Sequence, residues 1–225
     1  ERTFYERVVA HAPGNLRAVA NLGNIAFEQR DFETALLHLG AMADQWTPGT
    51  ADERHGLARA VEAARRVGDL DAARALATQL AAHHPDAGAG HRHLAGLAFD
   101  AGDHAAAFAH GMDWWRTARE PAALSLAGRS LLQGARRRTV TSADVASFFA
   151  VTDAATSIAP PRDALYHAAM ALHALGDRRA ALAALRQRQS AAPDAAWERA
   201  VAALEGEVGA ESRDGSGNGG ERPSD

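Results

Sequence analysis

Apolar residues in the first part of the chain recur at the three-to-four-residue spacing of an amphipathic helix, and short polar turns interrupt them. The segment "NLGNIAFEQRDFETALLHL", residues 21–39, contains two such stretches, hinged at Arg30-Asp31. A Gly-Asp turn before a small or apolar helix start recurs at 68–69, 102–103 and 176–177. The pattern therefore predicts pairs of helices joined by short turns.

These turns are regularly spaced, which is the mark of an internal repeat. Gly68 and Gly102 are 34 residues apart, whereas the interval from Arg30 to Gly68 is 38 and the interval from Gly102 to Gly176 is 74. The last two intervals equal one period plus four residues and two periods plus six. Prolines that follow amphipathic helices repeat at the same period with the same two insertions: Pro13, Pro85 and Pro193.

The two insertions can be placed from composition. The extra four residues fall near "WTPGTADE", residues 46–53, a stretch whose Pro, Gly and Thr are typical of a loop. The extra six fall around 135–141, inside the fourth helix pair, where Thr141 or Ser142 offers an N-cap for the next helix. The three arginines at 136–138 are therefore expected in a solvated loop.

A period of 34 with two helices per unit resembles the tetratricopeptide repeat (TPR) family over roughly residues 1–193. In the first unit Leu22-Gly23 fill the Leu-Gly place of the family motif, and Ala35 fills the small-residue place of the second helix. The fourth unit departs from the pattern, because Phe148 and Phe149 stand where a small residue is expected. Later units keep the contact residues Val61, Ala73, Ala95, Ala107, Ala169 and Ala181. The resemblance implies an all-α fold, an α-α superhelix that forms a right-handed TPR-like solenoid of antiparallel helix pairs.

The domain organisation follows from this periodicity. We expect one helical repeat array over 1–207 and a disordered tail over 208–225, because the tail has no apolar pattern. Trp197 and Leu204 are expected to turn inward from the last helix of the array. The parts of the array are a partial first repeat at 1–15, about five helix pairs over 16–193, and a capping helix at 194–207.

Composition supports an all-α protein and narrows its class. Hydrophobic residues make up 47% of the chain and aromatic residues only 6%, since the apolar supply is mostly Ala and Leu, both strong helix formers. The formal net charge of −4 is more acidic than expected of a general nucleic-acid binder. The absence of cysteine excludes disulfides and thiolate metal sites. The Ala- and Arg-rich usage favours a GC-rich bacterial genome.

Localisation is left open by the sequence. No apolar run approaches the roughly 18 residues of a membrane-spanning helix, and no signal peptide is recognisable. Because the chain begins at Glu1 rather than Met, and in mid-repeat, we expect a leader, an anchor or more protein upstream. A cytoplasmic location is favoured, a periplasmic or membrane-tethered location stays open, and the oligomeric state is not indicated.

The sequence contains no recognisable catalytic motif. It has no GxSxG, no phosphate-binding loop and no GxGxxG after a strand, so we expect neither an enzyme nor a cofactor. His91 and His93 invite a zinc site, but residues two apart on a helix point in different directions, and no metal site is predicted. Two aromatic pairs are expected to place one ring in the core and one partly in solvent: Trp114-Trp115 and Phe148-Phe149.

The resemblance implies that the first helix of each pair lines a concave groove, where TPR arrays bind extended peptides or partner helices. In the early units five arginines stand against three acidic residues, which predicts a ligand with carboxylate groups held by charge-assisted hydrogen bonds. The carboxylate clamp of the chaperone-tail-binding members is kept only at Asn24, so that ligand is not predicted. The predicted partner-binding residues are Arg17, Asn24, Glu28, His55, Arg59, Glu62, Arg65, Arg66, Arg92, His93, Tyr166 and His173.

The favoured interpretation is a non-catalytic protein–protein interaction scaffold that binds a partner peptide or helix in this groove. Two alternatives stay open. One is a regulatory or docking domain of a larger enzyme whose catalytic part lies upstream, and the other is an envelope export or assembly protein with a missing N-terminal anchor. The sequence that precedes Glu1 would distinguish them.

Overall fold

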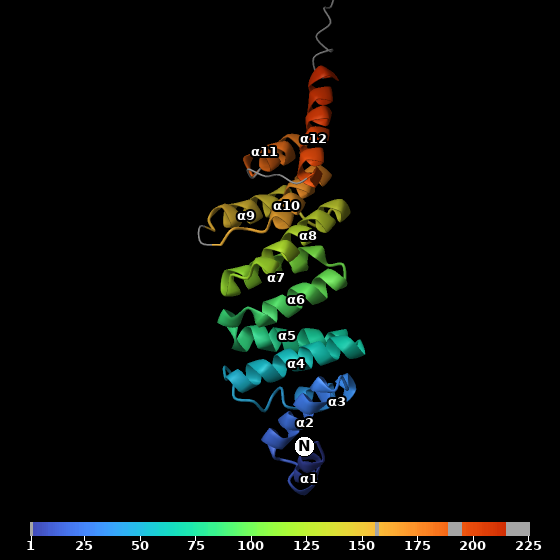
Figure 1. The fold of residues 1–225 in the computed structure, drawn as a ribbon, viewed down its shortest axis with the longest axis vertical. Helices are drawn as coiled ribbons and strands as arrows, with labels where there is room; N and C mark the ends of the chain where they lie inside the picture. The colour runs from blue at the N-terminus through green and yellow to red at the C-terminus, as the bar shows by residue number, and fades with distance from the viewer. Residues whose placement is uncertain (1, 156–157, 189–194, 215–225) are drawn as a thin grey trace, which may run out of the picture. The chain divides into compact units, whose positions relative to one another are not determined.

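A computed structural model describes residues 2–155, 158–188 and 195–214, and within these ranges all regular secondary structure is helical. The chain divides into two compact units, Glu1–Ala123 and Leu124–Asp225. Figure 1 shows the helices of the first unit stacked in chain order. The predicted all-α architecture of antiparallel helix pairs is confirmed.

The first unit holds three helix pairs preceded by a single helix. Consecutive helices pack against each other throughout this unit, so each pair is buried by its neighbours rather than by a central core. The elements are α1 (Arg2–His11), α2 (Leu16–Glu28), α3 (Phe32–Ala41), α4 (Ala51–Val67), α5 (Leu70–His83), the short 3-10 helix η1 (Pro85–Ala87), α6 (Ala89–Asp100) and α7 (His104–Ala118).

The second unit holds most of α8 and the remaining helices. The elements are α8 (Pro121–Arg137), α9 (Ser142–Asp153), α10 (Arg162–Ala174), α11 (Arg178–Gln187) and α12 (Ala195–Asp214).

Two boundaries predicted from the sequence differ from the structure. Arg136 and Arg137 form the last turn of α8 rather than part of a loop, so the insertion mainly lengthens this helix. The last helix is still regular over 208–214, which we had expected to be disordered, while 189–194 and 215–225 lie outside the described residues.

The turn inside most helix pairs is built in one way. The residue that closes the first helix has a positive φ, which glycine adopts without strain: φ is 85° at Gly68 and 77° at Gly102, whereas Arg30 takes 61° in the first pair. The next residue is an aspartate whose carboxylate accepts a hydrogen bond from the backbone N–H three residues on. These N-caps are Asp31, Asp69, Asp103 and Asp177.

The fourth pair starts its second helix differently. Thr141 is the N-cap of α9, and the side chain of Asp144 accepts a hydrogen bond from the Thr141 backbone N–H in return. This reciprocal arrangement is a capping box, and it confirms Thr141, rather than Ser142, as the cap.

Small residues at the repeat positions lie where helices cross. A side chain at Gly23 would place its Cβ 2.6 Å from Leu39 Cγ, so only glycine fits against α3. The alanines at the small-residue position of the second helix are fully buried: Ala35, Ala73, Ala107 and Ala181. Tight helix–helix contact therefore explains these motif residues without any functional role.

The two aromatic pairs correct one expectation. Trp114 and Trp115 are both buried, and so are Phe148 and Phe149, although one ring of each pair was expected to be partly exposed. Neighbouring side chains on a helix point about 100° apart, so a helix covered by neighbours on two sides buries both rings. These aromatic residues belong to the core.

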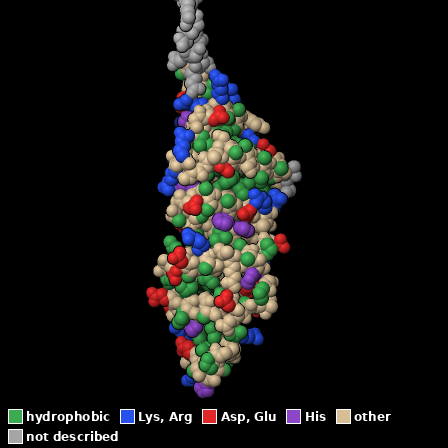
Figure 2. All heavy atoms as spheres, turned by 180° about the vertical axis from the view of Figure 1, so that it is seen from behind, with side chains coloured by type: hydrophobic (Ala, Val, Ile, Leu, Met, Phe, Trp, Pro, Cys, Tyr) green, Lys and Arg blue, Asp and Glu red, His purple; other side chains and the backbone are tan. Residues whose placement is uncertain are grey.

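Charge on the surface is mixed. Figure 2 shows basic and acidic side chains interspersed with apolar ones over the coloured part of the face that it draws. None of the helices that the structure describes has both the length and the apolarity needed to cross a lipid bilayer.

Candidate functional site

A groove of about 960 Å³ lies in the first unit between α2, α4 and the loop that joins α3 to α4. The loop, residues 42–50, contains the four-residue insertion, so the longer connection supplies one wall of the groove. The lining residues are Leu16, Arg17, Ala20, Asn21, Asn24, Met42, Gln45, Trp46, Thr47, Thr50, Asp52, His55, Gly56, Ala58 and Arg59.

Trp46 forms an aromatic wall of this groove because α4 has a glycine opposite it. A Cβ atom at Gly56 would lie 2.2 Å from the indole ring, closer than any real contact. Trp46 is only partly buried, so one side of the ring packs on α4 while the rest stays accessible. The sequence shows both residues, but not that they meet.

Four of the predicted partner-binding residues lie in the groove, namely Arg17, Asn24, His55 and Arg59. Arg59 is held firmly. Its Nη1 donates a hydrogen bond to Asn24 Oδ1 at 2.8 Å, its Nη2 lies 3.5 Å from Glu28 Oε1, and its guanidinium stacks on Phe27 at 5.5 Å. Arg17 is exposed, and among the described residues it has no ion-pair partner.

A second group of predicted residues forms ion pairs on the first helices. Glu62 lies 3.2 Å from Arg65 and 2.7 Å from Arg66, both on its own helix, and Arg65 reaches Asp100 of α6 at 3.1 Å. These side chains are partly or fully exposed, so each pair adds little stability. Their effect here is to neutralise charge that was expected to be available to a ligand.

The basic character of the surface is therefore smaller than the sequence suggested. Three of the five predicted arginines, Arg59, Arg65 and Arg66, already contact carboxylates. Arg17 and Arg92 are both exposed and without a salt bridge in the described ranges. Arg17, the one of these two that lines the groove, is the cation most available to a ligand there.

His93 is the predicted residue least available to a partner. Its Nε2 atom is buried and has no hydrogen-bond partner among the described residues. Burial of the imidazole, reinforced by the neighbouring charge of Arg92, lowers the pKa of His93 to about 4. The ring is therefore neutral at pH 7 and belongs to the packing of α6.

We compared the chain with known protein families, curated proteins and solved structures. No protein-family model and no curated protein matches the chain. A solved TPR protein, YrrB, whose crystal structure is described as having an unusual peptide-binding site, matches at 16% identity with a TM-score of 0.55, over 89% of this chain and 97% of that one. A TPR protein from Parabacteroides merdae matches at 13% identity with a TM-score of 0.50, over 94% of this chain and 79% of that one.

The fold is that of tetratricopeptide repeat proteins. The polar contacts fit this repeat, because they join first helices of successive TPR units. Asn24 and Arg59 are 35 residues apart, as are Arg65 and Asp100. Residues about one period apart therefore face each other, a rule that would have predicted these pairings from the sequence.

The remaining predicted residues lie in the second compact unit, Leu124–Asp225, where another helix covers them. Tyr166 packs against Trp197 of α12, with ring centroids 6.1 Å apart, and His173 Nε2 lies 3.0 Å from Glu207 Oε2 of the same helix. Both residues are half-buried. Side chains of α12 thus occupy the face of α10 that was expected to bind a partner.

A buried carboxylate in the first turn of α4 holds the groove wall in place. Glu53 is fully buried, with His83 Nδ1 donating to it at 2.5 Å, His84 Nε2 at 3.1 Å, and the Gly49 backbone N–H at 2.6 Å. Burial alone would raise the pKa of Glu53, but the hydrogen bond from His83, the bond from Gly49 and the two nearby imidazoles outweigh burial and lower it.

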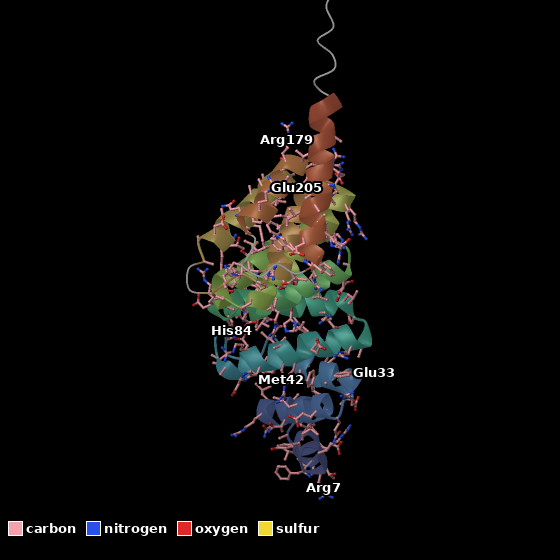
Figure 3. All side chains as sticks on the ribbon, turned by 45° about the horizontal axis from the view of Figure 1, so that its top comes forward. Arg7, Glu33, Met42, His84, Arg179 and Glu205 are labelled. Carbon is pink, nitrogen blue, oxygen red and sulfur yellow. The ribbon has the colours of Figure 1, made fainter. Side chains whose placement is uncertain are left out.

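This cluster ties the loop to two helices. Glu53 lies in the first turn of α4, Gly49 belongs to the loop, and His84 caps the end of α5, where Figure 3 labels it. Because charge-assisted hydrogen bonds are among the stronger ones, the loop wall of the groove is fixed before any partner arrives. The paired histidines at 83–84 are therefore structural.

Proposed function

We propose that the groove of the first unit binds a peptide segment or helix of a partner protein, and that the protein acts as a non-catalytic scaffold. The observation that carries the proposal is a preformed groove of about 960 Å³ with an anchored loop wall. A rigid wall lowers the entropy lost on binding, which is what a docking surface needs.

The lining combines features that suit a peptide. Leu16, Ala20 and Trp46 offer apolar surface, and an accessible aromatic ring is a frequent anchor for a partner side chain. The amides of the lining, among them Gln45, supply donors and acceptors for a peptide backbone, which must keep its hydrogen bonds when it leaves water.

We infer that the ligand carries a carboxylate close to Arg17. An exposed guanidinium without a salt bridge can form a bidentate pair with a carboxylate, whereas Arg59 would first have to leave Asn24 and Glu28. YrrB has a peptide-binding site, and the likeness in fold supports looking for a peptide here.

A displayed random-peptide library tests the proposal. We expect the full chain to select peptides with an apolar residue and an acidic residue or free C-terminus, and Arg17→Glu to weaken their binding by about tenfold or more. Arg74→Glu is the matched control, because Arg74 is an exposed arginine on α5 outside the groove. Circular dichroism of each variant checks that helicity is kept.

Two outcomes would contradict the proposal. If the full chain selects no peptide above background, the groove does not recognise peptides. If Arg17→Glu and Arg74→Glu weaken binding equally, the selected peptides bind elsewhere.

A further inference from the structure

A second cluster of polar side chains lies in the first unit, formed by residues that do not line the groove. His91 of α6 faces His110 and Asp113 of α7, and one donor atom from each of these three residues lies within 4.8 Å of the others. His110 and Asp113 are three residues apart and so share a face of α7. The paired helix α6 brings in the third side chain.

One nitrogen atom of each imidazole in this cluster lacks a hydrogen-bond partner in the described part of the chain. Nδ1 of His91 and Nδ1 of His110 are both buried and make no hydrogen bond in the described part of the chain. The two rings lie 5.9 Å apart at an angle of 34°. Burial and the nearby His91 ring lower the pKa of His110.

The two carboxylate oxygens of Asp113 have different neighbours. Its Oδ1 accepts a hydrogen bond from Arg116, while its Oδ2 points to His91 Nδ1 at 3.9 Å. A hydrogen-bonded carboxylate that keeps one oxygen free is the usual form of an oriented metal ligand. Arg116 would thus hold the ligand in place without blocking it.

We propose that His91, His110 and Asp113 bind a divalent late first-row transition metal ion of the Zn²⁺ class. Two imidazoles and a carboxylate favour such an ion over Mg²⁺ or Ca²⁺, which take mainly oxygen ligands. Three protein ligands leave a fourth position for water or for a group from another molecule. An ion would also give partners to nitrogen atoms that are costly to bury alone.

The distances suit this ion after a small adjustment. Tetrahedral Zn²⁺ with ligand bonds near 2.0–2.1 Å needs donor atoms about 3.3 Å apart. Side-chain rotation of His91, His110 and Asp113 can close the remaining gap, because all three are only partly buried. The paired helices α6 and α7 would keep their positions.

Metal titration of the full chain tests this site. After the protein is stripped with a chelator, we expect Zn²⁺ to bind at one equivalent by calorimetry, and Co²⁺ to give the visible absorption of a four-coordinate ion. His110→Phe keeps the ring volume but removes both nitrogens, and Asp113→Asn keeps the shape but removes the charge. Each should weaken Zn²⁺ binding by at least about tenfold, the smallest effect typical even of groups that only support metal ligands.

His11→Ala is the matched control, because it removes an exposed histidine of α1 whose ring bonds to the backbone of its own helix. Its Zn²⁺ affinity should equal that of the wild type. Failure of the wild type to saturate at one equivalent would overturn the site, as would equal losses in His11→Ala and His110→Phe. If His110→Phe loses helicity, Asp113→Asn decides, and unchanged binding by that variant would also overturn the site.

Discussion

The surface between α2 and α4 is open, whereas the corresponding surface between α10 and α12 is covered by side chains. Between α2 and α4 a groove remains, because the four-residue insertion places a loop and Trp46 beside the helices rather than between them. Between α10 and α12 the corresponding surface is filled by Trp197, which is 2% exposed and packs on Tyr166. One repeat plan therefore yields an open or a covered surface, depending on the segments that flank the helices.

The largest expected effect comes from uncovering the second junction. Trp197→Ala should lower the free energy of unfolding of the second unit by about 3–5 kcal/mol, because it removes a large side chain that is buried against α10. Hydrogen exchange resolved by peptide should show lost protection in α10, α11 and α12, with α2 to α5 unchanged, since repeat proteins lose stability locally. An equal loss of hydrogen-exchange protection in α2 would contradict the expectation that Trp197 stabilises only the helices around it.

The two units also differ in how strongly a histidine at the same repeat position makes stability depend on pH. His93 and His167 are 74 residues apart, the same interval as Gly102 and Gly176. Burial lowers the pKa of both, to about 4 for His93. Each group binds a proton more weakly in the folded state, so its contribution to stability is full above about pH 6.5 and is lost as the pH falls.

We expect the loss at His93 to reach roughly 2 kcal/mol near pH 4, after allowance for its partial exposure. Glu62 of α4 opposes this shift, and Arg65 and Arg92 support it. Urea unfolding at pH 7 and at pH 4.5 should show a smaller pH dependence for His93→Gln than for the wild type. Parallel pH profiles of the two proteins would show that burial of this imidazole is not responsible.

We expect His167→Gln to reduce the pH dependence of urea unfolding, relative to the wild type, by less than His93→Gln does. Asp163 raises the pKa of His167 against the effect of burial, and Arg129 and Arg136 lower it. A pH dependence smaller for His167→Gln than for His93→Gln would reverse the order that the burial of the two rings predicts.

The smallest change in stability is expected at the groove itself. Gly56→Ala places a methyl group against Trp46 and should cost about 1 kcal/mol, because the accessible indole can move away. The displaced ring should alter tryptophan fluorescence and weaken any peptide selected by the groove. Gly96→Ala on α6 is the control, since no atom lies within 4 Å of its Cβ position, and it should stabilise by about 0.5–1 kcal/mol. Equal peptide binding by both variants would show that Trp46 does not contribute to peptide binding in the groove.

The fold was predictable because its signals are local. The Gly-Asp turns mark the helix pairs, and Ala35 and its equivalents mark the crossings, so one sequence carries the same information several times. The end of α8 was not predictable in this way. Arg136 and Arg137 look like loop residues by charge, yet Lys and Arg also suit the last turn of a helix, where they face its negative end.

The candidate site was predictable only in part. Positions on the first helices placed Arg17, Asn24, His55 and Arg59 in the groove. Trp46 was missed, because a loop inserted into a repeat has no family position to carry over. Pairings such as Arg59 with Asn24 join side chains about one period apart, so the spacing of the repeat could have predicted them.

The aspartate that starts the second helix of most pairs has a consequence for how quickly the chain folds. Each pair closes through a turn of a few residues that carries its own start signal, so a hairpin can form before its neighbours do. The polar contacts between first helices span only 31 to 38 residues. Chains with such short contact distances fold rapidly, and nucleation can begin at any hairpin and spread in both directions.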